Sequence, residues 1–66
     1  MDVLRLAYLT SHYKKLSSDK LFDEAVLIAG FIREKQDVTL DAFSKNQKIK
    51  AEALLKDIFD ELHARN

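Results

Sequence analysis

Lysine side chains gathered near the start of an expected helix are the first feature of this 66-residue chain that could do chemistry. Lys45, Lys48 and Lys50 lie at or just before that start, where backbone N–H groups already carry partial positive charge. Cations beside a helix N-terminus form an anion site, so this cluster, with Lys56 further along, could contact phosphate groups. A solvated loop whose lysines keep the chain soluble is the competing interpretation.

The two histidines give weak grounds for catalysis or metal binding. His12 has no acidic residue at helical spacing on its face. His63 follows Asp60 and Glu61, but a histidine in the last turn of a helix commonly complements the helix dipole. The chain has no cysteine, which excludes disulfides and thiolate metal ligands. We therefore expect a protein that is not an enzyme and that carries no cofactor or metal.

Length and composition predict one small helical domain over residues 1–66 that gains stability by association. A chain of this size is near the lower limit at which one core outweighs chain entropy. Basic and acidic residues number 11 each, so net charge does not point to nucleic acid. No apolar run approaches the roughly 20 residues of a membrane span. The absence of cysteine and of signal-peptide features favours the cytoplasm.

The run of apolar or small residues at 25–32 is the strongest pattern in the chain. Ser17, Ser18 and Asp19 are capping residues for a helix that we expect from about Asp19 to Lys35. Such a helix is apolar on nearly all sides and is therefore expected to be buried. The pattern predicts a homodimer through this helix, and aspartate at Leu27 or Ile28 should abolish both dimerisation and folding. The expected interface residues on this helix are Phe22, Val26, Leu27, Ala29, Gly30 and Phe31.

An amphipathic helix is expected before this one, from Asp2 to Leu16. Leu6, Leu9 and Tyr13 form its inward stripe together with Leu16. Leu4 and Tyr8 project from roughly the opposite side, so we add them to the expected protein interface. With the apolar helix and the last third of the chain, this predicts a compact all-α bundle of three or four short helices.

The last third of the chain supports two interpretations. Its inward stripe is formed by Ala51, Leu54, Leu55, Ile58, Phe59 and Leu62. Ile49 falls on the far side of the same helix, which favours a short helix over 40–46, a turn over 46–49 and a final helix over 50–64. The alternative is one continuous helix from Lys45, capped by Ser44 with Gln47 three residues later as a capping box.

If the chain turns there, residues 39–60 resemble a helix-turn-helix unit. The positions that carry the resemblance are Phe43, Ser44, Ile49, Leu54 and Ile58. Gln47 stands where an aliphatic residue is expected, and Lys48 stands where glycine usually turns the chain. The resemblance implies a DNA-binding transcriptional regulator whose lysines contact phosphates. No arginine, asparagine or glutamine is placed on the second helix to read base edges.

The function we expect is that of a non-catalytic regulatory or adaptor protein. It would act through contacts with an unidentified protein partner, as a homodimer and away from membranes, with apolar anchors inside a charged rim. The alternative is the helix-turn-helix regulator, which would use the lysine cluster over residues 45–50.

Overall fold

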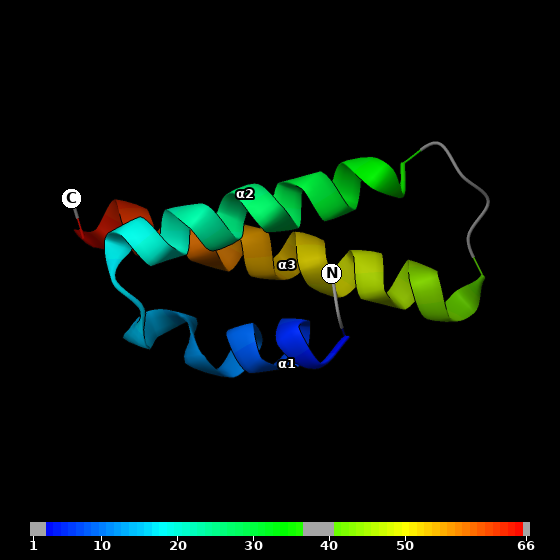
Figure 1. Ribbon diagram of the computed structural model, residues 1–66, viewed down its shortest axis with the longest axis horizontal. Helices are drawn as coiled ribbons and strands as arrows, with labels where there is room; N and C mark the ends of the chain where they lie inside the picture. The colour runs from blue at the N-terminus through cyan, green and yellow to red at the C-terminus, as the bar shows by residue number, and fades with distance from the viewer. Residues whose placement is uncertain (1–2, 37–40, 66) are drawn as a thin grey trace.

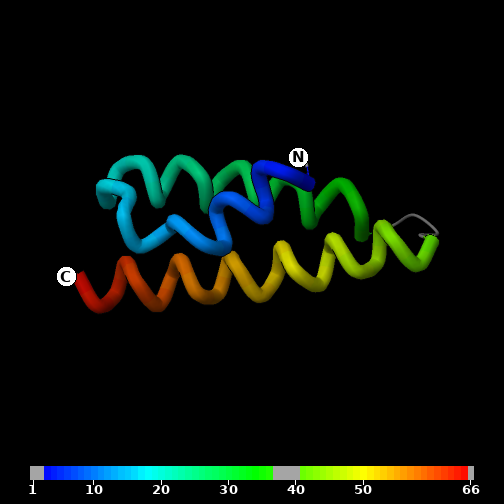
Figure 2. Tube along the Cα trace, turned by 90° about the horizontal axis from the view of Figure 1, so that it is seen from below, coloured from blue at the N-terminus to red at the C-terminus, as the bar shows by residue number. Residues whose placement is uncertain are grey.

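A computed structural model describes residues 3–36 and 41–65, and within them the chain is a bundle of three α-helices (Figure 1). The elements are α1 (Val3–His12), a 3-10 helix (Tyr13–Lys15), α2 (Ser18–Glu34) and α3 (Ala42–Arg65). Helices α2 and α3 lie side by side and antiparallel, and α1 packs along one side of the pair (Figures 1 and 2). The all-α class is confirmed. No helix in the described part is long and apolar enough to cross a membrane.

Helix α2 begins as its capping residues predict. Ser17 has an extended backbone, and its hydroxyl oxygen accepts a hydrogen bond from the backbone N–H of Lys20 at 3.3 Å. Asp19 lies in the first turn, where negative charge complements the helix dipole. The helix ends at Glu34, one residue before the expected end.

Helix α1 is shorter than predicted. The α-helix ends at His12, a 3-10 turn follows, and Leu16 is extended, with φ −81° and ψ 151°. The backbone N–H of Leu16 donates to the carbonyl oxygen of Tyr13 at 3.2 Å, which closes that turn. The chain leaves the helix here because the cap of α2 needs an extended residue at Ser17.

Helix α3 corrects the expected four-helix arrangement. It is continuous through residues 46–49, which confirms the alternative of one unbroken helix; the turn expected there, on which the helix-turn-helix resemblance depends, is not formed. The helix is capped by Asp41, whose carboxylate accepts a hydrogen bond from the backbone N–H of Ser44 at 2.7 Å, and it starts before Lys45. Gln47 and Lys48 favour helix where a turn would need glycine. The helix stays intact by leaving Ile49 62% exposed. Leu40, expected in the short helix, lies outside the described residues.

The core lies where one stripe from each helix meets the other two. Residues three and four apart share a helix face, so a short repeat in each helix suffices to build it. Gln47 is the polar residue buried beside these apolar side chains. The core side chains are Leu6 and Leu9 of α1, Leu21, Ala25 and Ile28 of α2, and Ala51, Leu54 and Ile58 of α3.

Arg65, in the last turn of α3, ties that end of the bundle to the connection between α1 and α2. Its guanidinium group donates to the carbonyl oxygens of Lys14 at 2.8 Å and Leu16 at 2.7 Å. It also forms an ion pair with Glu61, one turn earlier, at 3.0 Å. The planar group has five donors, so one side chain can satisfy carbonyls from two residues at once. The sequence analysis missed this contact.

Candidate protein interface

The pair formed by α2 and α3 has one side covered by α1 and one side that α1 leaves uncovered. Helix α1 is joined to α2 by an ion pair between the guanidinium group of Arg5 and the carboxylate of Glu24. Phe22 and Val26 lie roughly opposite Glu24, because each is two residues from it and a helix turns about 100° per residue. Both side chains therefore face away from α1, and they are 58% and 56% exposed.

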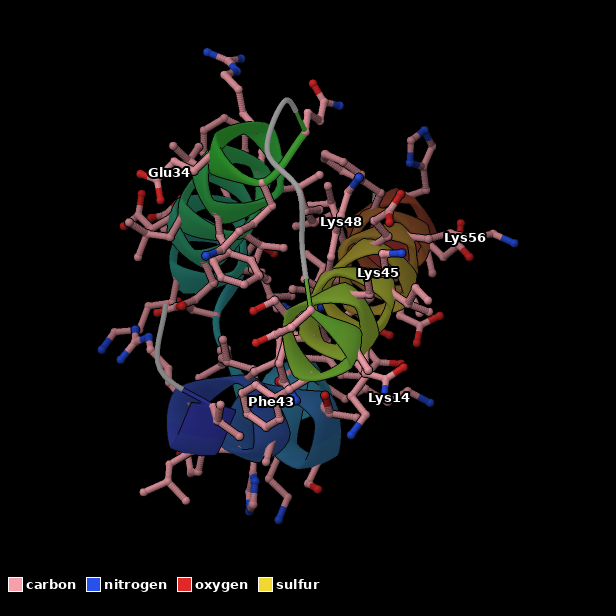
Figure 3. All side chains as sticks on the ribbon, turned by 90° about the vertical axis from the view of Figure 1, so that its right-hand side faces the viewer. Lys14, Glu34, Phe43, Lys45, Lys48 and Lys56 are labelled. Carbon is pink, nitrogen blue, oxygen red and sulfur yellow. The ribbon has the colours of Figure 1, made fainter. Side chains whose placement is uncertain are left out.

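Helix α3 completes this uncovered side. Leu55 and Phe59 line an open hollow together with Ile32 of α2, and Phe59 is 45% exposed. The view along the helices shows α1 beneath the pair, with Lys45, Lys48 and Lys56 directed away from it (Figure 3). We call this surface the outer face. Its apolar side chains are Phe22, Val26 and Ala29 of α2, with Ile32 at the seam, and Leu55 and Phe59 of α3.

Charges of opposite sign gather at the two ends of the outer face. Since α2 and α3 are antiparallel, the last turn of α2 adjoins the first turns of α3 (Figure 1). The basic end carries Arg33, Lys45, Lys48 and one carboxylate, Glu52; the acidic end carries Asp19 and Asp60 with one lysine, Lys56. Three cations less one anion make +2 at one end, and two carboxylates less one cation make −1 at the other. The outer face therefore has an apolar centre between two ends of opposite net charge.

Part of the interface predicted from the sequence lies elsewhere. Leu27, Gly30 and Phe31 line a separate hollow with Arg5 and Glu34, on the side of α2 that faces α1. Phe31 is only half-exposed there, because it packs against the core. Leu27 and Phe31 do not share a surface with Phe22 and Val26, whereas Gly30, one turn after Val26, lies at the border between the two flanks. The interface residues predicted on α2 are therefore divided between two flanks.

Leu4 and Tyr8 form a third surface, on the back of α1. They are 78% and 55% exposed, as the sequence pattern predicts. The ring of Tyr8 stacks on the ring of His12, with centroids 4.4 Å apart, and Nδ1 of His12 lies 2.9 Å from the carbonyl oxygen of Tyr8. This part of α1 lies on the far side of the bundle from Val26, so it does not extend the outer face.

Sequence reasoning missed Leu55 and Phe59 as surface residues. It assigned both to the inward stripe of α3, but that stripe is wider than the contact that two neighbouring helices provide. Ala51, Leu54 and Ile58 fill the contact, which leaves Phe59 at its edge. The sequence does indicate that some apolar residues of α3 must be exposed, because this helix has more of them than one helix face can bury.

The lysines do not form the predicted anion site. With α3 continuous from Ala42, Lys50 lies about 12 Å along the helix from its N-terminus, too far to join the free backbone N–H groups. Lys50 lines a groove between α1 and α3, with Thr10 and Asp57, whereas Lys45, Lys48 and Lys56 face the other way. The four lysines are thus divided between two surfaces.

The groove between α1 and α3, of about 440 Å³, is the larger hollow near α1. Apolar atoms of Val3, Leu6 and Leu54 line most of it. The hydroxyl group of Thr10 donates to the carbonyl oxygen of Leu6 at 2.9 Å and so serves the helix itself. Over residues 3–36 and 41–65, no three histidine or acidic side chains come close enough to hold a metal ion. The other polar residues that line the groove are Ser11, Gln47, Lys50 and Asp57.

Comparison of the chain with protein-family models, with curated proteins and with solved structures found no match. The function is therefore argued from the outer face and from the surfaces around it.

Proposed function

We propose that this protein is a non-catalytic regulatory or adaptor module that binds proteins and that works as a homodimer through the outer face. The observation that carries the proposal is the exposure of Phe22, Val26 and Phe59 together on one side of the α2–α3 pair. Removing apolar surface from water contributes about 25 cal/mol per Å², and aromatic side chains supply the most area. Large aromatic groups inside a charged rim are the usual anchors of protein interfaces.

The size of the chain supports a second copy as the partner. The accessible surface is 4814 Å². A standard interface takes about 800 Å² from each partner, which is about one sixth of this surface. The outer face runs along two long helices, and a matching pair of helices from a second copy can cover it. Small helical domains commonly gain their missing core by such association.

A non-catalytic role is supported by how the polar groups are used. Thr10 bonds its own helix, Arg65 holds backbone carbonyls, and Glu24 is paired with Arg5, so these groups stabilise the bundle. The lack of cysteine in the sequence is compatible with a reducing compartment, and we place the protein in the cytoplasm on that ground.

Analytical ultracentrifugation of the protein and of two matched variants tests the proposal. Val26→Asp introduces a charge at the centre of the outer face, and it should weaken the dimer by about 100-fold because the partner would have to bury that charge. Val26 is 56% exposed, so the variant should remain helical by circular dichroism. Tyr8→Asp is the control, because Tyr8 is 55% exposed on the back of α1, on the far side of the bundle from the outer face.

The expected result is a dimer for the protein and for Tyr8→Asp, and a folded monomer for Val26→Asp. A protein that sediments as a monomer at millimolar concentration would overturn the homodimer. Equal weakening by both substitutions would place the contact somewhere other than the outer face.

A further inference from the structure

We infer that the two copies pack antiparallel, α2 against α2 and α3 against α3, about a two-fold axis that crosses the helices at Val26. This inference rests on the proposed function and specifies the geometry of its dimer. Asp19 and Arg33 lie seven residues before and seven residues after Val26. Both side chains are exposed. Reversal of α2 about Val26 therefore places Asp19 of each copy opposite Arg33 of the other.

The sizes of the side chains along α2 fit the same two-fold symmetry. Phe22 lies four residues before Val26, and Gly30 lies four residues after it. A side chain built at Gly30 would meet no atom of its own chain within 4 Å. An antiparallel copy therefore brings the exposed ring of Phe22 over an open position, beside the small side chain of Ala29. Close packing of a large group onto a small one is how helices interlock.

Helix α3 adds charges of the same pattern. The two-fold axis at Val26 crosses α3 near Leu54, because Ser18 lies beside Arg65 and Phe31 lines a hollow with Gln47. Lys48 and Asp60 lie six residues before and six residues after Leu54. Reversal of α3 in the second copy therefore brings each of these lysines towards the partner's carboxylate. It also brings the basic end, with Lys45 and Lys48, over the acidic end of the partner.

The other face-to-face arrangement is unfavourable. A two-fold axis parallel to the helices would place α2 over α3 of the second copy and would stack each end on the same end of the partner. The +2 ends would then face each other, as would the −1 ends. Like charges across an interface oppose association and select against wrong arrangements. Charge complementarity thus selects the arrangement that crosses the helices.

Charge reversal tests the pairing of Asp19 with Arg33. Asp19→Arg alone and Arg33→Asp alone each produce like charges at two symmetric positions, and each should weaken the dimer about tenfold. The double variant Asp19→Arg/Arg33→Asp restores unlike pairs and should return to within about threefold of the original affinity. Both substitutions oppose the dipole of α2, so the double variant has the least stable monomer. If the dimer of this variant recovers, the recovery therefore cannot be caused by a more stable helix α2.

Disulfide trapping tests the position of the axis, and the absence of native cysteine makes each cross-link unambiguous. Val26→Cys should form a cross-linked dimer under mild oxidation, seen on non-reducing gels, because the two thiols meet at the axis. A mixture of Asp19→Cys and Arg33→Cys chains should cross-link 19 to 33. Asp19→Cys alone should remain uncross-linked, because the two copies of this position would be about 21 Å apart.

The outcomes separate the two proposals. If sedimentation shows a dimer, but Asp19→Cys cross-links to itself or the double charge variant stays weak, the antiparallel arrangement is wrong while the homodimer stands. If every chain, including the parent, is monomeric, both proposals fail. Tyr8→Cys, on the back of α1, serves as the matched control, and cross-linking of this variant as efficient as that of Val26→Cys would also overturn the geometry.

Discussion

The two sides of the α2–α3 pair carry similar apolar side chains, yet within residues 3–36 and 41–65 only one of them is covered by another helix. On the covered side, Leu6 and Leu9 of α1 are 3% and 2% exposed against Ile28 and Leu54. On the outer face, Phe22 and Val26 remain more than half exposed. Residue type therefore does not distinguish a core side from a docking side here.

The difference teaches that the number of helices decides which apolar residues become an interface. Two antiparallel helices offer a groove on each side, and this chain has one further helix in its described part to fill them. Covering both sides would need a fourth helix, which is the familiar four-helix arrangement. In the proposed homodimer, a second copy of the protein would supply that layer without a longer chain.

The largest expected effect is the difference in stability between aspartate substitutions at two neighbouring residues of α2. Ile28 is fully buried and Leu27 is 55% exposed on the flank towards α1. Ile28→Asp should unfold the protein, with a loss above about 4 kcal/mol, because a charge would be buried without a partner. Leu27→Asp should stay folded and dimeric, which corrects the expectation from the sequence that both would unfold. Circular dichroism and sedimentation check this, and unfolding of Leu27→Asp would contradict the assignment of flanks.

The next largest effect is expected from Arg65, whose hydrogen bonds hold the connection between α1 and α2 against the end of α3. Arg65→Ala removes the hydrogen bonds to the carbonyl oxygens of Lys14 and Leu16 and should cost about 1–2 kcal/mol in thermal or urea unfolding. Hydrogen exchange should speed up most around the connection between α1 and α2. Arg65→Lys is the control that keeps the charge; it should recover only part of the loss, because an ammonium group lacks the planar fork. Full recovery would assign the effect to charge alone.

A smaller effect is expected at Gly30, where one substitution should stabilise the fold and weaken the dimer. Gly30→Gln should stabilise the isolated helix by about 0.5 kcal/mol, since glycine is a poor helix former and the added side chain meets open space. The same side chain would occupy the position that the partner's ring needs, so the dimer should weaken. Thermal unfolding at high dilution and sedimentation measure the two quantities separately. A stronger dimer would argue against contact at this position.

The smallest effect is the pH dependence of the start of α3. The hydrogen bond from the backbone N–H of Ser44, its hydroxyl group and the positive charge of Lys35 lower the pKa of Asp41 from its ordinary 3.8. A carboxyl group with a lowered pKa in the folded state contributes stability that is present above pH 3.8 and is lost as the pH falls through the folded value. NMR titration should show the first turn of α3 fraying in acid. Asp41→Asn, which keeps a capping oxygen without titrating, should remove that pH dependence.

Much of the secondary structure follows from local chemistry that can be recognised in the sequence. Ser17 and Asp19 predict the start of α2, and the stripe that includes Leu6 and Leu9 predicts the inward side of α1. The sequence left a break in α3 open because the position of Ile49 favoured one, but one exposed isoleucine costs less than breaking a helix of good helix formers. The cap at Asp41 was missed because Ser44 offered an equally suitable side chain three residues later.

The sequence by itself determined the all-α class, the amphipathic stripes and the excess of apolar residues, because these depend on residue type and on helical spacing along one chain. The tertiary structure alone decided which flank of each helix is covered, that Phe22, Val26 and Phe59 share one surface, and that Arg65 reaches Lys14 and Leu16. Those facts depend on how helices distant in sequence are oriented around one another, and helical periodicity carries no information about which neighbour occupies which side.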